Sequence, residues 1–437
     1  MFPRKNPLDT KGVTIVTEHS FRVNNIDLYT FLNPHLNSFC ISLYVRAGSL
    51  FEDDSECGIT HLLEHSIYRN LKNHYDNFYE LMSLHGLDMN ATTYKEFVVF
   101  SVEGPDESFN LAADIILHIF DEISLTKEEF RLEKERIFAE IYESDEKNTV
   151  GYRFRNAVWN GTNVQKSTLG SRSGVEKISL KKLNLYREKI FAKENVFVYV
   201  TGNINNNLIE NLKNKLSDVK INNFSTGFEN KVNSIGNFFK RDKNITVKSS
   251  DWTYIQIGFD VETQRYKSGV HALLYSVLFK GDNALFYNTV SEDKALVYSY
   301  DATYEQYDDV GNLYFRFETE PQKIYSVFTA VAELLNDFKN GRFNFDAFLN
   351  REKLNCKREL DNVGNLNWSL AYYNHILKSD GIDYTKEGYG IYDGITKENV
   401  VNAAKEIFKT SNMTIAMRGN KRKIDVEKIY EIMKSIN

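Results

Sequence analysis

The sequence predicts an α+β fold built from two homologous α/β-sandwich domains, each with helices packed on a mixed, largely antiparallel sheet. Strand-like and helix-like segments alternate in runs along the chain, which is typical of this class. Two short motifs recur in the same order at one offset of about 211 residues. The chain has 437 residues, of which 42% are hydrophobic and 26% charged, so more than one domain with a large core is expected.

The first copy is predicted to begin with short strands, in which β-branched and aromatic residues lie between turn signals. These strands are predicted at 13–16, 27–32, 39–45 and 97–102. Helices are predicted at 58–69, 78–85 and 111–119. A long helix follows, because Thr126 with Glu129 three residues later forms a capping-box pattern. The segment 195–201 is predicted to be a buried strand that ends at Gly202.

The second copy repeats the helix at 58–69 as residues 269–280, with matching apolar positions. At the same offset, the segment Asn90-Ala91-Thr92 matches Asp301-Ala302-Thr303. We therefore predict a duplicated domain. The predicted division is a first domain at 1–221, a polar junction at 222–248 and a second domain at 249–437.

Composition and charge argue against several classes of function. The net charge is −6 and no long basic run is present, which disfavours nucleic acid or an anionic membrane as the main partner. No apolar run approaches the roughly 18 residues of a membrane span, so no span is predicted. Three scattered cysteines indicate reduced thiols, and the first residues lack an apolar signal core, so a cytoplasmic protein is expected.

A candidate metal site begins with the sequence His-Leu-Leu-Glu-His at 61–65. At about 100° per residue, His61, Glu64 and His65 fall on one face of a helix, and the apolar residues of the segment fall on the other. Zinc binds neutral histidine nitrogens, and a catalytic zinc keeps one position open beside three protein ligands. Glu64 is placed to take the proton of a zinc-activated water.

The third ligand is expected on a neighbouring element. The long helix offers Glu133 and Glu140, two turns apart at the edge of an apolar stripe. The alternative is that the histidines are structural and both glutamates are solvated helix charges. The second copy has Ala272, Tyr275 and Ser276 in place of His61, Glu64 and His65. The second copy is therefore predicted to have lost its metal.

The order of these motifs resembles that of the inverted-motif zinc peptidases, the family of pitrilysin, insulin-degrading enzyme and the mitochondrial processing peptidases. The resemblance covers nearly the whole chain and rests on the segments 46–52, 58–65, 86–92 and 133–141, with 74 residues between His65 and Glu140. It implies that His61, His65 and Glu140 hold one zinc ion, that Glu64 is the general base and that Glu133 orients a ligand histidine. It also implies that Asn90, Ala91 and Thr92 form the sheet edge on which the substrate lies as an added strand.

The same resemblance implies a clamshell fold, of which this chain is half, around a chamber that admits unfolded peptides. Short members of the family act as dimers, and active members present an Arg and a Tyr, seven residues apart, from the second domain to bind the substrate carbonyl. Here Tyr298 is in place, but Ser291 stands at the arginine position. A serine cannot donate a charge-assisted bond to a developing oxyanion, a contribution worth about 3–4 kcal/mol.

We therefore predict a zinc metalloendopeptidase that is the metal-bearing half of a heterodimer, in which a homologous subunit supplies the Arg and the Tyr. An active homodimer, in which Lys294 or another cation replaces the Arg, is the alternative. The expected substrates are unfolded peptides, either in turnover or in the maturation of a ribosomally made peptide. A non-catalytic structural subunit and a peptide-binding, chaperone-like chamber are the competing classes. The intact metal set, Glu64 included, argues against the structural subunit.

Overall fold

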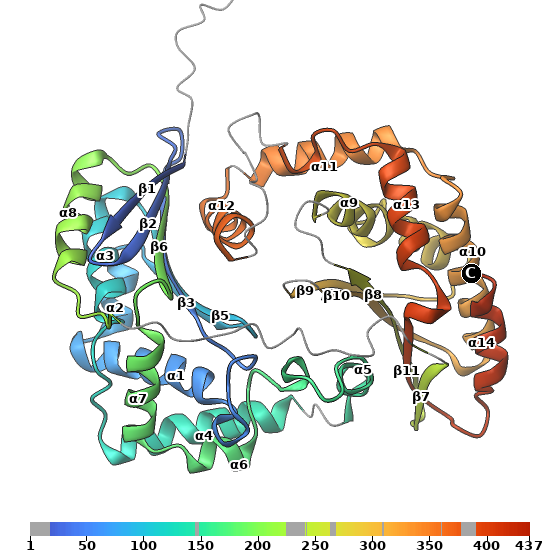
Figure 1. Ribbon diagram of the computed structural model, residues 1–437, viewed down its shortest axis with the longest axis horizontal. Coiled ribbons are helices and arrows are strands. Elements are labelled where there is room, and N and C mark those ends of the chain that lie inside the picture. Colours follow the sequence, from blue (N-terminus) through green and yellow to red (C-terminus); the bar gives the residue numbers. More distant parts are fainter. Residues whose placement is uncertain are drawn as a thin grey trace, which may run out of the picture.

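The computed structural model describes residues 18–144, 148–223, 241, 243–262, 268–307, 310–359, 361–376 and 390–437. These residues form two α/β units side by side, each with one β-sheet and a layer of helices packed on it (Figure 1). The predicted α+β class with two sandwich domains is therefore confirmed. Among the described residues, no helix is both long and apolar enough to cross a membrane.

The first sheet has six strands in the order β1-β2-β6-β3-β5-β4. Their bounds are β1 Glu18–Val23, β2 Ile26–Leu32, β3 Phe39–Arg46, β4 Asp88–Thr93, β5 Phe97–Gly104 and β6 Val196–Gly202. The helices of this unit are α1 Ile59–His74, α2 Phe78–Leu84, α3 Phe109–His118, α4 Lys127–Glu143, α6 Arg172–Lys177, α7 Leu180–Ile190 and α8 Asn206–Ser217. The central strand β3 is buried along seven of its eight residues, whereas β4 lies at the sheet edge and is exposed at Asp88 and Asn90. The edge strand β4 therefore has one side on which no strand of this sheet pairs.

The second sheet has five strands in the order β7-β11-β8-β10-β9. Their bounds are β7 Asn244–Ser249, β8 Thr253–Glu262, β9 Tyr300–Tyr307, β10 Val310–Thr319 and β11 Met413–Gly419. The helices packed beside it are α9 Ser268–Phe279, α10 Ile324–Lys339, α11 Phe345–Glu359, α13 Lys397–Ile407 and α14 Val426–Lys434. Without β1, the first sheet has the same strand order as the second, and the equivalent pairs β2–β6 and β7–β11 are both parallel. The identical topology supports the predicted duplication.

The helix α5 (Val150–Val158) lies within the sequence of the first unit, between α4 and α6, but packs on the second sheet, against β11, β8 and β7. The contact is close, because a Cβ atom at Gly258 of β8 would lie 2.2 Å from the Phe154 ring of α5. Phe154 and Trp159 belong to a small core that also contains Tyr307 of the second unit. Residues of the first half of the chain therefore form a small core together with residues of the second sheet.

The helix α12 (Val363–Leu370) makes the reciprocal contact, because it lies within the sequence of the second unit, between α11 and α13, but packs on β3 and β6 of the first sheet (Figure 1). Its buried Asn367 accepts a hydrogen bond from the Tyr44 hydroxyl and donates to the carbonyls of Cys40 and Tyr199, at 3.1–3.2 Å. Buried amides without such partners would cost several kcal/mol. The exchange of α5 and α12 thus ties the two halves together with apolar and polar contacts.

The predicted helices and strands of the first unit match the observed ones to within a few residues at their ends. The capping box at Thr126 is confirmed: the Thr126 Oγ1 accepts the Glu129 N–H at 3.2 Å, and the Glu129 carboxylate accepts the Thr126 N–H at 2.8 Å. The strand predicted at 13–16 lies outside the described residues, and β1 at Glu18–Val23 was not predicted. The strand β7 begins inside the predicted junction, and the division at 221 and 249 stays a prediction.

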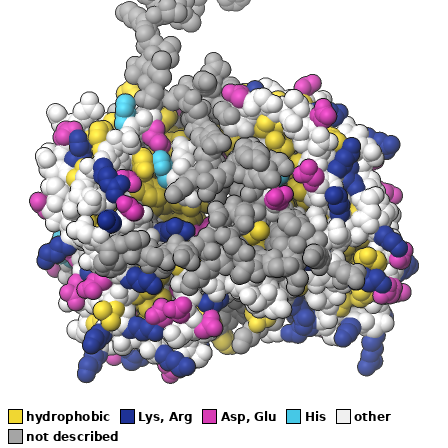
Figure 2. Space-filling view, viewed as in Figure 1, with side chains coloured by type: hydrophobic (Ala, Val, Ile, Leu, Met, Phe, Trp, Pro, Cys, Tyr) yellow, Lys and Arg dark blue, Asp and Glu magenta, His cyan; other side chains and the backbone are white. Residues whose placement is uncertain are grey.

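The visible face of the molecule shows basic and acidic side chains interspersed over both halves (Figure 2). The described residues on this face form no extended patch of one sign.

Candidate active site

The start of α1 is held by a buried carboxylate. The Glu52 side chain accepts hydrogen bonds from the backbone N–H groups of Gly58 at 2.8 Å and Thr60 at 3.0 Å, which are unsatisfied donors at a helix N-terminus. Burial raises the pKa of Glu52, and these hydrogen bonds offset only part of that rise. Gly58 has φ +93°, and its Cα lies so close to Gly170 that a side chain on Gly170 would clash with it. The first turn of α1, which carries His61, is thereby fixed.

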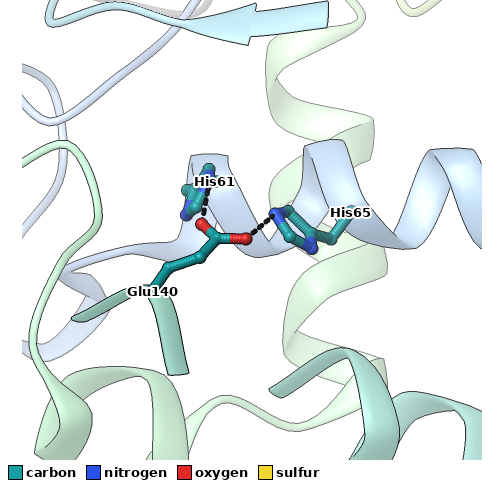
Figure 3. A group of neighbouring side chains, drawn as sticks. All are labelled: His61, His65 and Glu140. Carbon is teal, nitrogen blue, oxygen red and sulfur yellow. Dashed lines mark ion pairs between the residues drawn. The ribbon is translucent and has the colours of Figure 1, made fainter. Parts of the chain in front are cut away.

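Three predicted ligands meet between α1 and α4. His61 and His65 project from α1 toward Glu140 of α4 (Figure 3). The His61 Nε2 lies 3.5 Å from one Glu140 oxygen, and the His65 Nε2 lies 3.4 Å from the other. One ligand atom from each of the three residues lies within 4.8 Å of the others.

These distances fit a zinc ion. Zinc bonds to His nitrogen and carboxylate oxygen are about 2.0–2.2 Å, so two ligands of a tetrahedral site lie about 3.4 Å apart. Each histidine–glutamate separation is close to this value, with each histidine facing a different oxygen of the Glu140 carboxylate. Burial, with the charge of His65 as a smaller cause, lowers the pKa of His61 to about 3. The His61 imidazole is therefore neutral near pH 7, as a metal ligand must be.

Glu133 lies behind His65 and is only 1% exposed. Its carboxylate is 3.8 Å from the His65 Nδ1 and accepts hydrogen bonds from Arg69 Nε at 2.7 Å and Arg136 Nη1 at 2.9–3.0 Å. Burial by itself raises the pKa of Glu133, but hydrogen bonds from His65 and Arg69 and the charge of Arg136 outweigh it and lower the pKa to about 2. An ionised carboxylate at this place can hold the His65 ring in one orientation.

Glu64 directly precedes His65, follows His61 by about one helical turn, and contacts the edge strand. The Thr93 hydroxyl of β4 donates a hydrogen bond to the Glu64 Oε2 at 2.5 Å. Burial raises the pKa of Glu64, against the opposing effect of the hydrogen bonds from Thr93. A carboxylate with a raised pKa is suited to proton transfer near neutral pH.

The predicted substrate-binding residues Asn90, Ala91 and Thr92 lie in the edge strand β4 next to α1. Tyr298 does not join this group: it lies between the π-helical turn Tyr287–Glu292 and β9 in the second repeat, and its side chain is 96% exposed. In the same turn, Ser291 donates its hydroxyl to the carbonyl of Val297 at 2.6 Å. Lys294 pairs with Glu333 of α10 at 2.7 Å.

Sequence reasoning missed three groups around this site. Arg69 follows His65 by four residues, and Arg136 follows Glu133 by three. This helical spacing could have indicated both arginines. Thr93 directly follows the 90–92 segment, but a single threonine carries no pattern that points to Glu64.

Known proteins resemble this chain in sequence and in fold. The family model for Insulinase (Peptidase family M16) matches residues 33–172, and the model for the Peptidase M16 inactive domain matches residues 177–350. YmxG, an uncharacterized zinc protease of Bacillus subtilis, is 23% identical over 362 residues, which cover 82% of this chain and 85% of the relative. The mitochondrial-processing peptidase subunit beta of Lentinula edodes is 24% identical over 202 residues, 46% of this chain and 43% of the relative.

The fold comparison agrees with the sequence comparison. The crystal structure of a protease from Helicobacter pylori superposes with a TM-score of 0.78 at 17% sequence identity and covers 92% of this chain and 99% of that one. The second family model, named for an inactive domain, falls largely on the repeat in which Ala272 and Ser276 replace the two histidines. Together the two family models span most of the chain and meet at the α6–α7 region, and the chain belongs to the insulinase family, peptidase family M16.

Proposed function

We propose that this chain is a zinc-dependent endopeptidase, or the metal-bearing subunit of one, that hydrolyses unfolded peptides. The observation that carries the proposal is the meeting of His61, His65 and Glu140 at separations close to those of zinc ligands, with Glu64 next to His65 on the same helix. One zinc ion is the proposed cofactor, and relatives such as YmxG are named zinc proteases.

Zinc, when bound, supplies Lewis-acid chemistry that makes a water nucleophilic near neutral pH and polarises the scissile carbonyl. Glu64 accepts the proton of the attacking water on its carboxylate, which the Thr93 hydroxyl holds, and passes it to the nitrogen of the leaving amine. His61 and His65 act as neutral ligands, and Glu133, which lies 3.8 Å from the His65 Nδ1, orients the His65 ring. The products are a carboxylic acid and an amine, so the reaction is balanced without any other reactant.

The substrate is proposed to bind as an extended strand on the free side of β4, at Asn90, Ala91 and Thr92. Only a peptide without its own secondary structure can add to a sheet edge in this way, because its backbone groups must be unpaired. A second subunit is proposed to close the chamber over this edge.

That second subunit is proposed to be a homologue that supplies an Arg and a Tyr, which makes the enzyme a heterodimer. Two observations support this proposal: Ser291 at the arginine position is bonded to Val297, and the nearest alternative cation, Lys294, is paired with Glu333. Tyr298 is exposed and can still act. The relative from Lentinula edodes is by name a subunit of its enzyme.

The test uses the purified chain, alone and mixed with a homologous subunit that carries the Arg and Tyr, on an internally quenched unstructured peptide. We expect zinc-dependent cleavage only in the mixture, and none with Glu64→Gln although zinc content stays at one per chain. Full cleavage by the chain alone would establish the homodimer instead. Peptide binding without cleavage in any mixture would make the chain a binding subunit. Removal of a leader segment from a precursor peptide would narrow the substrate class to peptide maturation.

A further inference from the structure

Two side-chain hydrogen bonds join α1 to the edge strand β4. The Tyr68 hydroxyl donates to the carbonyl of Met89 at 3.2 Å, and the Thr93 hydroxyl donates to the Glu64 Oε2 at 2.5 Å. Glu64 and Tyr68 lie one turn apart on the same face of α1. Met89 and Thr93 are the two residues that immediately precede and follow the 90–92 segment. The helix that carries the histidines therefore holds the strand on both sides of that segment.

We infer that Thr93 is a positioning residue that fixes the Glu64 carboxylate relative to the substrate-binding strand, an inference that rests on the proposed function. The Thr93 hydroxyl bonds the Oε2 of this carboxylate and so restrains its orientation. The β-branched threonine has few accessible χ1 rotamers, and pairing of Thr93 with Val98 fixes its backbone in the sheet. The bond to a buried carboxylate is charge-assisted and therefore strong.

Tyr68 has a different role, because its hydroxyl bonds only to backbone. It holds the Met89 end of the strand without touching Glu64. Loss of this bond changes where the strand and an added peptide lie, and leaves the Thr93–Glu64 bond in place. The Tyr68–Met89 bond therefore affects where the peptide lies, and the Thr93–Glu64 bond affects how the general base is oriented.

The second repeat supplies a natural comparison for this link. At the positions of Glu64 and Thr93 it has Tyr275 and Tyr304. The Tyr275 hydroxyl donates to the carbonyl of Ala302 in β9 at 2.9 Å, and the Tyr304 hydroxyl lies 2.9 Å from the His271 Nδ1. Side-chain hydrogen bonds thus join a helix to the edge strand in both repeats. Of these bonds, the one between Thr93 and Glu64 in the first repeat has a carboxylate as its acceptor. The link itself stabilises the fold, and its chemistry in the first repeat serves Glu64.

The test compares Thr93→Val, which keeps shape and loses the donor, with Thr93→Ser, which keeps the donor. With the active assembly, Thr93→Val is expected to lower kcat roughly tenfold or more, as loss of a bond to a charged group implies, with KM and zinc content unchanged. Thr93→Ser is expected to retain most of kcat. Tyr68→Phe is expected to raise KM with little change in kcat. Tyr304→Phe, the matched variant of the second repeat, is expected to leave both constants unchanged.

A kcat for Thr93→Val equal to that of the unchanged protein, or an equal loss with Thr93→Ser, would overturn the inference. A second measurement does not depend on turnover: crystal structures of the zinc-loaded Thr93→Val and Thr93→Ser proteins. We expect the Glu64 carboxylate to keep its place in the serine variant and to leave it in the valine variant, and an unmoved Glu64 in both would contradict the inference. If no assembly cleaves peptides but Glu64 moves as expected, the proposed function fails and the positioning role of Thr93 stands.

Discussion

The two repeats place equivalent helix pairs beside equivalent sheet edges, but they neutralise a buried carboxylate in different ways. In the first repeat, α1 and α4 present His61, His65 and Glu140 around a position for a metal ion, with Glu133 behind them. In the second repeat, α9 and α11 have Ala272 and Ser276 at the histidine positions.

The second helix pair nevertheless keeps the acidic residues. Glu352 and Glu359 of α11 are seven residues apart, as are Glu133 and Glu140 of α4, and Glu352 is 2% exposed. Asn355, three residues after Glu352, donates a hydrogen bond to the Glu352 carboxylate at 3.3 Å. Arg136, three residues after Glu133, donates to the Glu133 carboxylate in the same way. These agreements indicate that α11 descends from a helix with the same charge pattern.

The cation beside this carboxylate has changed. The Arg351 Nε lies 2.9 Å from a Glu352 oxygen, and its Nη2 donates to the Ser276 Oγ at 2.7 Å, at the position that His65 holds in the first repeat. A buried carboxylate is costly without a cation and hydrogen bonds. The comparison teaches that the second repeat lacks both histidines of the proposed metal site, while its buried glutamate still has a positive charge beside it.

The strongest test of the contrast is His65→Ala against Ser276→Ala at the matching position. Loss of His65 removes one of three proposed ligands, so the zinc content should fall from one per chain toward zero. The turnover rate should fall at least about a thousandfold, because several kcal/mol of Lewis-acid stabilisation are lost. Elemental analysis and the peptide assay measure both. Ser276→Ala should leave both unchanged, and a similar loss in the two variants would break the comparison.

Arg351→Ala tests the substitute cation. Glu352 would keep only Lys280, at 4.0 Å, and the neutral Asn355 as partners, so the free energy of unfolding should fall by about 3 kcal/mol in urea titrations. Zinc content should stay at one per chain. The double variant Arg351→Ala/Glu352→Gln should recover part of the loss, because no uncompensated charge is then buried. A double variant less stable than the single one would show that Arg351 acts through packing alone.

Glu133 predicts a pH dependence in the zinc-free protein. Its pKa is about 2 in the folded state, below the usual 4.5, so its ionised form stabilises the fold above pH 4.5, and this stability is lost as the pH falls toward 2. The loss should amount to about 3 kcal/mol in denaturant titrations at stepped pH. Glu133→Gln should flatten that part of the profile. An unchanged slope in the variant would mean that other carboxylates cause the acid sensitivity.

The smallest expected effect should be equal in the two repeats. Thr126 caps α4 and Thr396 caps α13, each with a reciprocal bond to the residue three positions on. Thr126→Ala and Thr396→Ala should each lower the free energy of unfolding by about 1 kcal/mol, because one helix donor loses its acceptor. A much larger effect of Thr126→Ala, accompanied by zinc loss, would show that the cap also positions Glu140.

Much of the fold and of the candidate site could be predicted from the sequence, because those features are local. The 3.6-residue period placed Ile59, Leu62, Leu63 and Ile67 on the core side of α1, and all four are buried. The capping box placed the start of α4 correctly. The histidine spacing and the seven-residue glutamate spacing likewise follow from helix geometry.

The sequence alone did not indicate contacts that depend on packing between distant segments. The exchange of α5 and α12 was not predicted, although Val150-Gly151 and Val363-Gly364 open both helices in the same way. The Thr93–Glu64 bond spans 29 residues between a strand and a helix, and Arg351 reaches Ser276 across 75. No periodic pattern encodes such pairs.

The sequence by itself determined the duplicated α+β architecture and the residue types of the candidate metal site, because helix period and caps act within a few residues along the chain. Only the tertiary structure decided that Glu140 meets both histidines at about 3.4 Å, that Thr93 holds Glu64 and that Arg351 lies beside the second repeat's buried glutamate. Close packing fixes these distances, since each one depends on how two separately formed elements fit together.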